Sequence, residues 1–338
     1  MRGFGKKVKL TAVSATFPNM SSNLFRTCDD PLNLQYRIER ISTLAEQWNL
    51  VEVRPLVLEY KIPEKLFYEL VTSVGNYVFR CLQIPGNKIS LENLHLDKYR
   101  ESRKNVTPNG ACVPKLEYQF LYNDVLQNWF RVFRSMISRN ESILKLVRVT
   151  PNIRLKFGRE LEDNEKRGLN TQLPHSDAWV EGPWGFNVFT PLFGDCQNNT
   201  LRYYDLPDGD LPETFFSTVG SYTEKQKLIS KFKEDLTFLP KAGHIYISDY
   251  AIVHKTWRSK NSSARVSIDT TLLVGNHDVH PDRRDEYLNA IPDVGNSHFF
   301  KVMASENATT INEKKTTYSH YTTGTIQCLE LPHRIHRQ

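Results

Sequence analysis

Short apolar segments with the alternation of β-strands follow one another through the second half of this 338-residue chain. Polar loops and turn residues separate them. The predicted strands span residues 144–149, 153–157, 184–193, 200–204, 244–253 and 265–274. This succession favours an antiparallel double-sheet jelly roll, that is, a cupin-like double-stranded β-helix.

The first 140 residues carry the patterns of helices. Apolar residues recur at helical spacing in residues 31–48 and 63–83, and a strand is predicted between them at 51–60. The strongest helical stripe lies in residues 114–140 and comprises Leu116, Phe120, Leu121, Val125, Trp129, Val132, Phe133 and Met136. We therefore predict a mainly β fold with helical additions, in which N-terminal helices brace the jelly-roll core.

Three regions are expected to form a single composite domain. A helix-rich region at 1–140 packs on a jelly-roll core at 141–280, and a C-terminal extension spans 281–338. The core contains an insertion near 205–240 with a short helix. The extension contains a predicted helix at 281–287 and polar segments that would form a lid or an oligomer contact.

Two histidines and one carboxylate in the strand-rich region have the residue types of a metal site. His175 and Asp177 are two residues apart, so both would point to the same face of an extended strand. His254 stands at the end of the predicted strand 244–253. Two histidines and one carboxylate are the ligands of non-haem Fe(II) sites that keep coordination positions open. His175, Asp177 and His254 are therefore the predicted metal ligands and catalytic residues.

An inward-facing arginine is predicted at the start of the last strand of the core. Residues 255–264 are polar and predict a loop, and the alternation that follows puts Arg265 and Ser267 on one face. This hairpin would bring Arg265 back beside the metal site. An arginine on an apolar strand needs a partner, and a carboxylate can accept two charge-assisted hydrogen bonds from its planar fork.

The order His175-Ser-Asp177, His254 and Arg265-Val-Ser267 resembles the Fe(II)/2-oxoglutarate-dependent dioxygenase superfamily. The resemblance covers about residues 150–275 and is closest to the phytanoyl-hydroxylase-like and bacterial biosynthetic branch. It implies Fe(II), the cosubstrate 2-oxoglutarate and O2, with Arg265 and Ser267 binding the 5-carboxylate of the cosubstrate. It also implies that oxidative decarboxylation of 2-oxoglutarate is coupled to hydroxylation or a related oxidation. Halogenases of this superfamily replace the carboxylate by a small residue, so Asp177 favours hydroxylation or a related oxidation.

Other residues near the predicted site have two interpretations each. Asn187 and Thr190 would contact the cosubstrate or the substrate. Alternatively, their polar side chains would form hydrogen bonds within the barrel. Three tryptophans would shape the pocket or pack in the core: Trp179, Trp184 and Trp257. Five cations would form a solvated rim or bind an anionic substrate: Arg154, Lys156, Arg202, Lys255 and Arg258. Arg154 and Lys156 would assist cosubstrate binding if they face the site.

The composition of the chain limits the classes of partner that we expect it to bind. The net charge of +6 is mild for this length and comes without a long basic run, so nucleic-acid binding is not expected. No apolar run approaches the ~18–20 residues that span a bilayer, and the basic N-terminus lacks a secretory apolar segment, so a cytoplasmic protein is expected. The five scattered cysteines indicate neither a disulfide framework nor a zinc knuckle. The expected partner is a small biosynthetic metabolite, carbohydrate-linked or anionic, and a homodimer is one alternative for the assembly.

Two other functions stay open at this point. One is a cupin-like metal enzyme that does not use 2-oxoglutarate, such as an isomerase or an oxygen-only dioxygenase, and Arg265-Val-Ser267 speaks against it. The other is a non-catalytic metal- or ligand-binding protein of the same fold. The intact set of His175, Asp177, His254 and Arg265 speaks against that second alternative.

Overall fold

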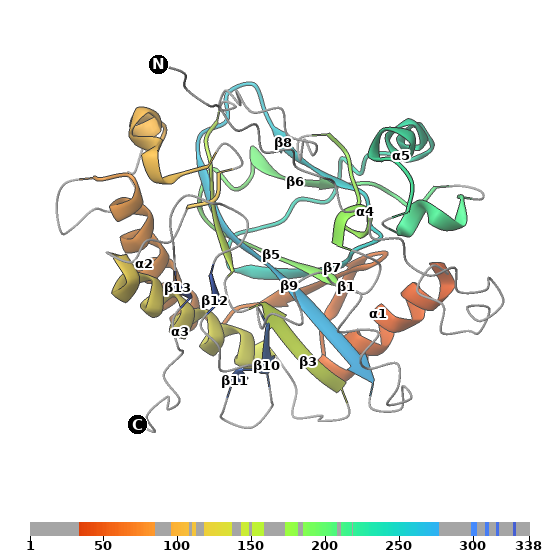
Figure 1. The fold of residues 1–338 in the computed structure, drawn as a ribbon, viewed down its shortest axis with the longest axis horizontal. Coiled ribbons are helices and arrows are strands. Elements are labelled where there is room, and N and C mark those ends of the chain that lie inside the picture. Colours follow the sequence, from red (N-terminus) through yellow and green to blue (C-terminus); the bar gives the residue numbers. More distant parts are fainter. Residues whose placement is uncertain are drawn as a thin grey trace, which may run out of the picture.

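The computed structural model describes ten longer stretches of the chain and four short strands after them. The stretches are 34–84, 96–107, 110–112, 118–136, 143–148, 151–158, 173–181, 185–207, 211–217 and 219–276, and the strands are 299–302, 308–310, 316–317 and 327–328. Within these residues the chain forms antiparallel sheets and a few helices (Figure 1). Trp184 and the predicted helix at 281–287 lie outside the described residues.

A nine-stranded antiparallel sheet forms the centre of the fold. Its order is β1 (Val51–Arg54), β2 (Val57–Lys61), β7 (His244–Asp249), β5 (Phe186–Gly194), β9 (Arg265–Asn276), β3 (Ile143–Arg148), β10 (Phe299–Val302) and β11 (Ala308–Thr310), and β4 (Asn152–Lys156) also pairs with β9. One edge of β9 pairs with β5, and the other pairs first with β4 and then with β3. The start of β9 therefore lies between β4 and β5.

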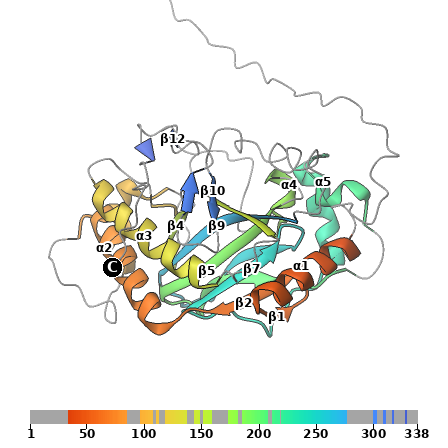
Figure 2. The same ribbon diagram turned by 90° about the horizontal axis from the view of Figure 1, so that it is seen from below.

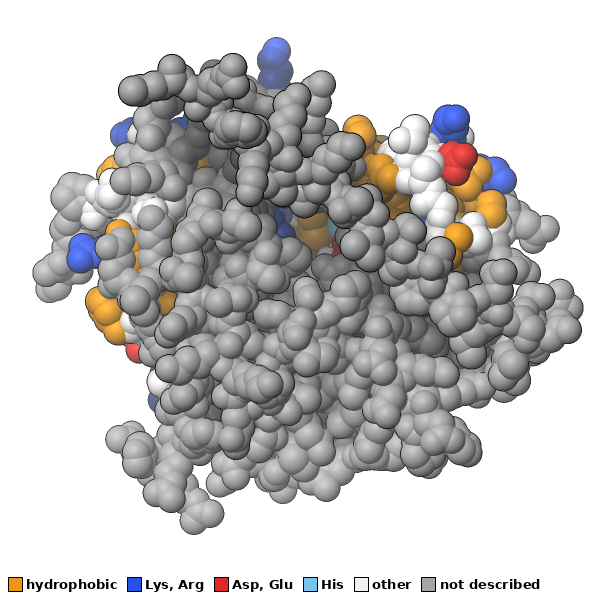
Figure 3. All heavy atoms as spheres, in the orientation of Figure 1, with side chains coloured by type: hydrophobic (Ala, Val, Ile, Leu, Met, Phe, Trp, Pro, Cys, Tyr) orange, Lys and Arg blue, Asp and Glu red, His pale blue; other side chains and the backbone are white. Residues whose placement is uncertain are grey.

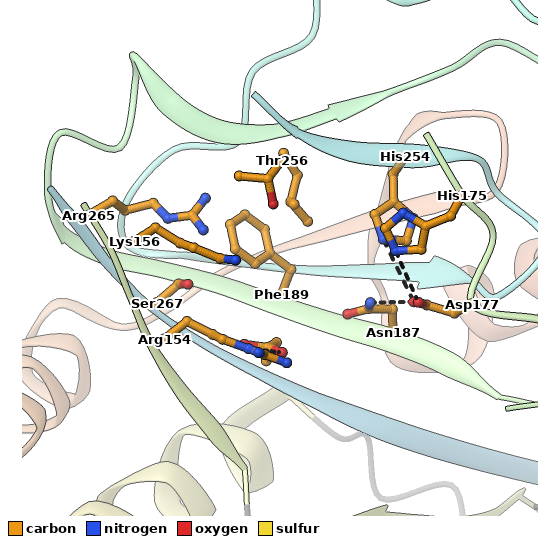
Figure 4. A pocket seen from close by; sticks show the side chains of 12 residues that line it. Arg154, Lys156, His175, Asp177, Asn187, Phe189, His254, Thr256, Arg265 and Ser267 are labelled. Atoms are coloured by element: carbon orange, nitrogen blue, oxygen red, sulfur yellow. Dashed lines mark hydrogen bonds and ion pairs between the residues drawn. The ribbon is translucent and has the colours of Figure 1, made fainter. Parts of the chain in front are cut away.

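A small second sheet lies across from this centre. It pairs β6 (Asn199–Tyr203) with β8 (His254–Arg258), and Figure 4 shows both strands on the opposite side of a cavity from β5 and β9. The loop predicted at 255–264 is wrong for its first residues, because the backbone of 255–258 pairs with β6 despite its polar side chains. A third, two-stranded sheet joins β12 (Thr316–Thr317) and β13 (Gln327–Cys328).

Three N-terminal helices share one hydrophobic core with the large sheet. They are α1 (Leu34–Trp48), α2 (Glu64–Cys81) and α3 (Gln119–Met136), which correspond to the predicted helices at 31–48, 63–83 and 114–140. Ile41, Val74 and Trp129 belong to the same buried cluster as Val188 and Leu272 of the sheet. The core thus extends across residue 140, and α2 and α3 lie side by side (Figure 2). The predicted strand at 51–60 is a hairpin, β1 and β2, that turns at Pro55 and Leu56.

The insertion near 205–240 builds a second, aromatic cluster. It contains the predicted short helix, which is α5 (Tyr222–Leu228), and two 3-10 turns, η4 (Glu213–Phe216) and η5 (Ile229–Lys231). Their apolar side chains pack with Trp179, which follows the predicted metal ligands in sequence. A 3-10 helix, η2 (Leu96–Asn105), lies between α2 and α3 in the sequence. None of the described helices is long and apolar enough to cross a membrane.

Candidate metal centre and adjoining cavity

A pair of backbone hydrogen bonds brings the two predicted histidine ligands together. His175 N–H donates to the carbonyl of His254, and His254 N–H donates to the carbonyl of His175, both at 2.9 Å. The two imidazole rings lie 4.6 Å apart between centroids. His175 is thus a single bridging residue next to the first residue of β8, and the chain then turns into α4 (Ala178–Glu181). The extended strand predicted for His175 and Asp177 is wrong, because only His175 pairs.

The turn nevertheless places Asp177 against both histidines. The Asp177 carboxylate lies 3.9 Å from His175 Nε2 through Oδ1 and 3.8 Å from His254 Nε2 through Oδ2. One potential ligand atom from each of the three residues lies within 4.8 Å of the others. Ser176 points away, as predicted, and donates to the carbonyl of Tyr250 at 2.6 Å. The three side chains predicted as ligands therefore converge on one point.

Backbone carbonyls orient both imidazole rings. Nδ1 of His175 lies 2.9 Å from the carbonyl of Leu173, and Nδ1 of His254 lies 3.3 Å from the carbonyl of Ile252. Because a carbonyl oxygen can only accept, each Nδ1 carries a proton, and Nε2 is the ring nitrogen that faces Asp177. Burial, reinforced by His254, lowers the pKa of His175 to about 4. His175 is therefore neutral near pH 7, the form that binds a metal ion.

A cavity of about 110 Å³ extends from this triad along the inner face of the sheet. It is lined by Arg154, Lys156, His175, Asp177, Asn187, Phe189, Leu201, His254, Thr256, Arg265, Ser267 and Asp269. In Figure 4 the triad stands at one end, Arg265 and Ser267 lie at the other, and Phe189 lies between them. Figure 3 shows cationic, histidine and acidic atoms in a hollow near the middle of the molecular face that it draws. At about 30 Å³ for each water molecule, this volume corresponds to roughly four waters.

The end of the cavity away from the triad presents buried donors without partners. The Arg265 guanidinium is 2 % exposed, and within the described residues its Nε and Nη1 have no hydrogen-bond acceptor. The Ser267 hydroxyl, fully buried, has no partner there either. Burial lowers the pKa of Arg265 to about 10, so the group still carries its charge at neutral pH. Unpaired buried donors of this kind fit a bound carboxylate.

Two neighbouring cations behave differently from each other. Arg154 Nε donates to both carboxylate oxygens of Asp269, at 3.2 and 3.0 Å, so these two charges compensate each other. Lys156 is 8 % exposed and lines the cavity, without an acidic partner in the part of the chain that the structure describes. Burial, followed by the charges of Arg154, Arg258 and Arg265, holds the pKa of Lys156 well below its usual value.

The remaining predicted residues divide between the site and other surroundings. Asn187 lines the cavity and donates to Asp177 Oδ2 at 2.6 Å, so it contacts a predicted metal ligand. Thr190 is fully buried but does not line the cavity, so its predicted contact with cosubstrate has no support from this placement. Trp179 packs in the aromatic cluster, and Trp257 stacks under Arg202 at 4.4 Å. Lys255 pairs with Glu234 at 2.6 Å, and Arg258 donates to the carbonyl of Phe157.

Four lining residues were not predicted from the sequence: Phe189, Leu201, Thr256 and Asp269. Two of them follow from strand alternation once the facing of the strand is known. Phe189 is two residues from Asn187 on β5, and Asp269 is two residues from Ser267 on β9. Leu201 and Thr256 are Cα partners on β6 and β8 and close the cavity from the opposite sheet.

No protein-family model matches this chain, and no curated protein matches it. Solved structures similar to it include the non-heme monooxygenase ThoJ, at 13 % identity over 69 % of this chain and 79 % of ThoJ, with a TM-score of 0.33. The alpha-ketoglutarate-dependent carbocyclase SnoK from nogalamycin biosynthesis is 10 % identical over 69 % of this chain and 86 % of SnoK, with a TM-score of 0.34. An N-substituted L-amino acid dioxygenase from Burkholderia ambifaria AMMD is 12 % identical over 69 % of this chain and 87 % of that protein, also at 0.34. All three TM-scores are below 0.5, and the case for a function of this chain comes from its own residues.

Proposed function

We propose that this protein is a non-haem Fe(II) oxygenase that uses 2-oxoglutarate and O2 to hydroxylate, or otherwise oxidise, a small molecule. The observation that carries the proposal is that one cavity holds a two-histidine, one-carboxylate cluster and the buried guanidinium of Arg265, whose Nε and Nη1 have no hydrogen-bond acceptor among the described residues. A metal cluster alone fits many hydrolases and isomerases. An unpaired buried arginine in the same cavity adds the requirement for an anionic ligand.

The residues present fit Fe(II). Two neutral imidazoles and one carboxylate form the donor set of the facial triad of non-haem iron oxygenases, which leaves positions open for other ligands. Nε2 of His175, Nε2 of His254 and the Asp177 carboxylate would hold the ion. When bound, the iron would supply the redox chemistry that couples O2 and 2-oxoglutarate to substrate oxidation.

The chain's own residues have three tasks in this reaction. His175, Asp177 and His254 fix the metal, and the carbonyls behind each Nδ1 keep the rings in the ligating tautomer. Arg265 and Ser267 would bind the 5-carboxylate of 2-oxoglutarate and so orient its opposite end towards the metal. Phe189 and Leu201 line the space between and limit the access of water. We also propose that the core is a jelly roll, as the succession of strands predicts. We further propose that the enzyme belongs to the phytanoyl-hydroxylase-like branch that the motif order resembles.

Anaerobic addition of Fe(II) and 2-oxoglutarate to the full chain tests the proposal. We expect a weak metal-to-ligand charge-transfer band in the visible spectrum, and we expect Asp177→Ala to abolish it. Asp205→Ala serves as the matched control, because Asp205 is exposed and does not line the cavity. A folded wild-type protein that binds Fe(II) but gives no band with 2-oxoglutarate would favour a metal enzyme that does not use this cosubstrate. A protein that binds no metal would favour a non-catalytic role.

A further inference from the structure

We infer that Lys156 binds the same ligand carboxylate as Arg265, so that the anion-binding end of the cavity uses two buried cations from neighbouring strands. The inference rests on the proposed function and deepens it. It assigns a second cosubstrate contact to a residue that lies outside the motif His-x-Asp, His and Arg-x-Ser.

Strand register places the two cations beside each other. Lys156 on β4 and Arg265 on β9 are Cα partners in the antiparallel ladder, so their side chains leave the same face of the sheet. Both line the cavity, and both are buried, at 8 % and 2 % exposed. Figure 4 shows the two side chains extending towards the same part of the cavity, with Ser267 next to them. A carboxylate placed there would be within the reach of all three.

The charged groups of the cavity favour an anion at this end. The lining residues include three cations, Arg154, Lys156 and Arg265, and two carboxylates, Asp177 and Asp269. Asp269 is taken up by Arg154 through both of its oxygens, and Asp177 belongs to the metal cluster. Among the described residues neither Lys156 nor Arg265 forms an ion pair with a carboxylate, and Asp269 attracts both of them without such a pair. A buried guanidinium beside a buried amine costs free energy, either as two close positive charges or as a lysine that has lost its proton, and a bound carboxylate would recover part of this cost.

The lowered pKa of Lys156 is consistent with an anion that binds between Lys156 and Arg265. Burial, with the positive charges of Arg154, Arg258 and Arg265, holds the pKa of Lys156 well below its usual value. An anion that arrives between Lys156 and Arg265 offsets these influences and favours the ammonium form. Because a divalent metal ion would add further positive charge at the other end of the cavity, a dianion suits the site better than a monoanion.

The test compares two ligands that differ only at the end in question. Calorimetric titrations of the Mn(II)-loaded full chain use 2-oxoglutarate and 2-oxopentanoate, in which a methyl group replaces the distal carboxylate. We expect Lys156→Met to weaken binding of 2-oxoglutarate by about tenfold or more, the scale of a charge-assisted hydrogen bond. We expect the same variant to change the affinity for 2-oxopentanoate by less than about twofold, within the scatter of a change at a distance. Arg265→Met should show the same selectivity.

Matched variants separate a direct contact from a structural effect. Lys156→Arg keeps the charge and should retain more affinity for 2-oxoglutarate than Lys156→Met. Lys156→Gln replaces Lys156→Met if the latter does not fold. Lys241→Met removes a cation at an exposed position before β7 and should leave both affinities unchanged.

Each other outcome is informative. Wild-type protein that binds 2-oxoglutarate in an Arg265-dependent way, with Lys156→Met unchanged, overturns the inference and leaves the proposed function standing. Equal losses for both ligands would place Lys156 at the metal-binding end of the ligand and also overturn the inference. Metal-loaded wild-type protein that does not bind 2-oxoglutarate overturns both proposals.

Discussion

The side-chain amide of Asn187 donates a hydrogen bond to Asp177 Oδ2 at 2.6 Å, which joins the large sheet to the turn that carries the carboxylate of the metal cluster. Asn187 Oδ1 is buried and has no partner among the described residues, so one more polar group is available at this position. Because groups that hydrogen-bond to metal ligands orient them, Asn187 is expected to act on the metal through Asp177.

Asn187→Leu should weaken metal binding without removing it. The substitution removes the hydrogen bond that holds Asp177 and leaves all three ligands in place, so we expect an affinity loss of about 10- to 100-fold. Titration of the metal-free protein with Mn(II) in competition with a chelator measures the effect. Asn128→Leu on α3 is the matched control, because Asn128 lies outside the cavity lining and its side chain accepts an exposed hydrogen bond from Arg131. Equal affinities in wild type and Asn187→Leu would show that Asp177 needs no support from β5.

Asp249→Ala should strongly destabilise the fold. Asp249 and Arg37 are both fully buried and form an ion pair that joins α1 to the end of β7. Asp249 also accepts the backbone N–H of Ala251 at 2.8 Å, in the turn that leads to β8. Removal of one partner of a buried ion pair leaves a buried charge, at a cost of about 3–5 kcal/mol.

Urea unfolding of the Arg37 and Asp249 variants measures this cost. The double variant Arg37→Met, Asp249→Ala should recover part of the loss, because it no longer buries the Arg37 charge without its partner. Asp205→Ala is the control, since its carboxylate pairs with Arg54 at an exposed position. A loss no larger than that of the control would contradict the structural role given to this pair.

Gly194→Ala should impair both stability and anion binding. Gly194 has φ +82°, and a Cβ there would lie 2.3 Å from the carbonyl oxygen of Ala264, directly before Arg265. The substitution must therefore move the backbone that positions the guanidinium. Gly243→Ala is the matched control, because Gly243 has φ +81° but a Cβ there would meet only the Phe67 ring, at 3.8 Å.

Both glycine variants should lose about 1–2 kcal/mol from the left-handed backbone conformation. Only Gly194→Ala should lose more than this, and only Gly194→Ala should bind 2-oxoglutarate less tightly. Urea unfolding measures the free energy of unfolding, and calorimetry measures the affinity for 2-oxoglutarate. Similar losses in the two variants would mean that the loop before Arg265 adjusts without consequence.

The metal-free protein should lose stability as His175 is forced to take up a proton. Burial lowers the pKa of His175 to about 4, from 6.5 in a model peptide. Between these values the unfolded chain binds more protons at this position than the folded chain. The free energy of unfolding should therefore fall as the pH falls from 6.5 to 4. The variant His175→Gln has no imidazole to protonate. The difference in the free energy of unfolding between wild type and this variant should therefore narrow as the pH falls from 6.5 to 4. A constant difference would contradict the buried neutral state of His175.

Local patterns predicted the helices and the residue types of the site well. The helical stripes correspond to α1, α2 and α3, and the alternation after Arg265 corresponds to β9. Phe120, included in the predicted stripe, is 61 % exposed, because a stripe does not specify which part of it a neighbouring element covers. The polar residues after His254 form β8 because their backbone pairs with β6, a long-range contact without a local signature.

The sequence by itself determined which chemical groups are available: two histidines, a carboxylate, and an arginine with a serine two residues later. Only the tertiary structure decided that Asn187 holds Asp177 and that Lys156 stands beside Arg265 in the cavity. The physical reason is that side-chain types and spacing are local properties. The facing of a strand and its register depend instead on backbone pairing between distant segments, such as β4 with β9 and His175 with His254.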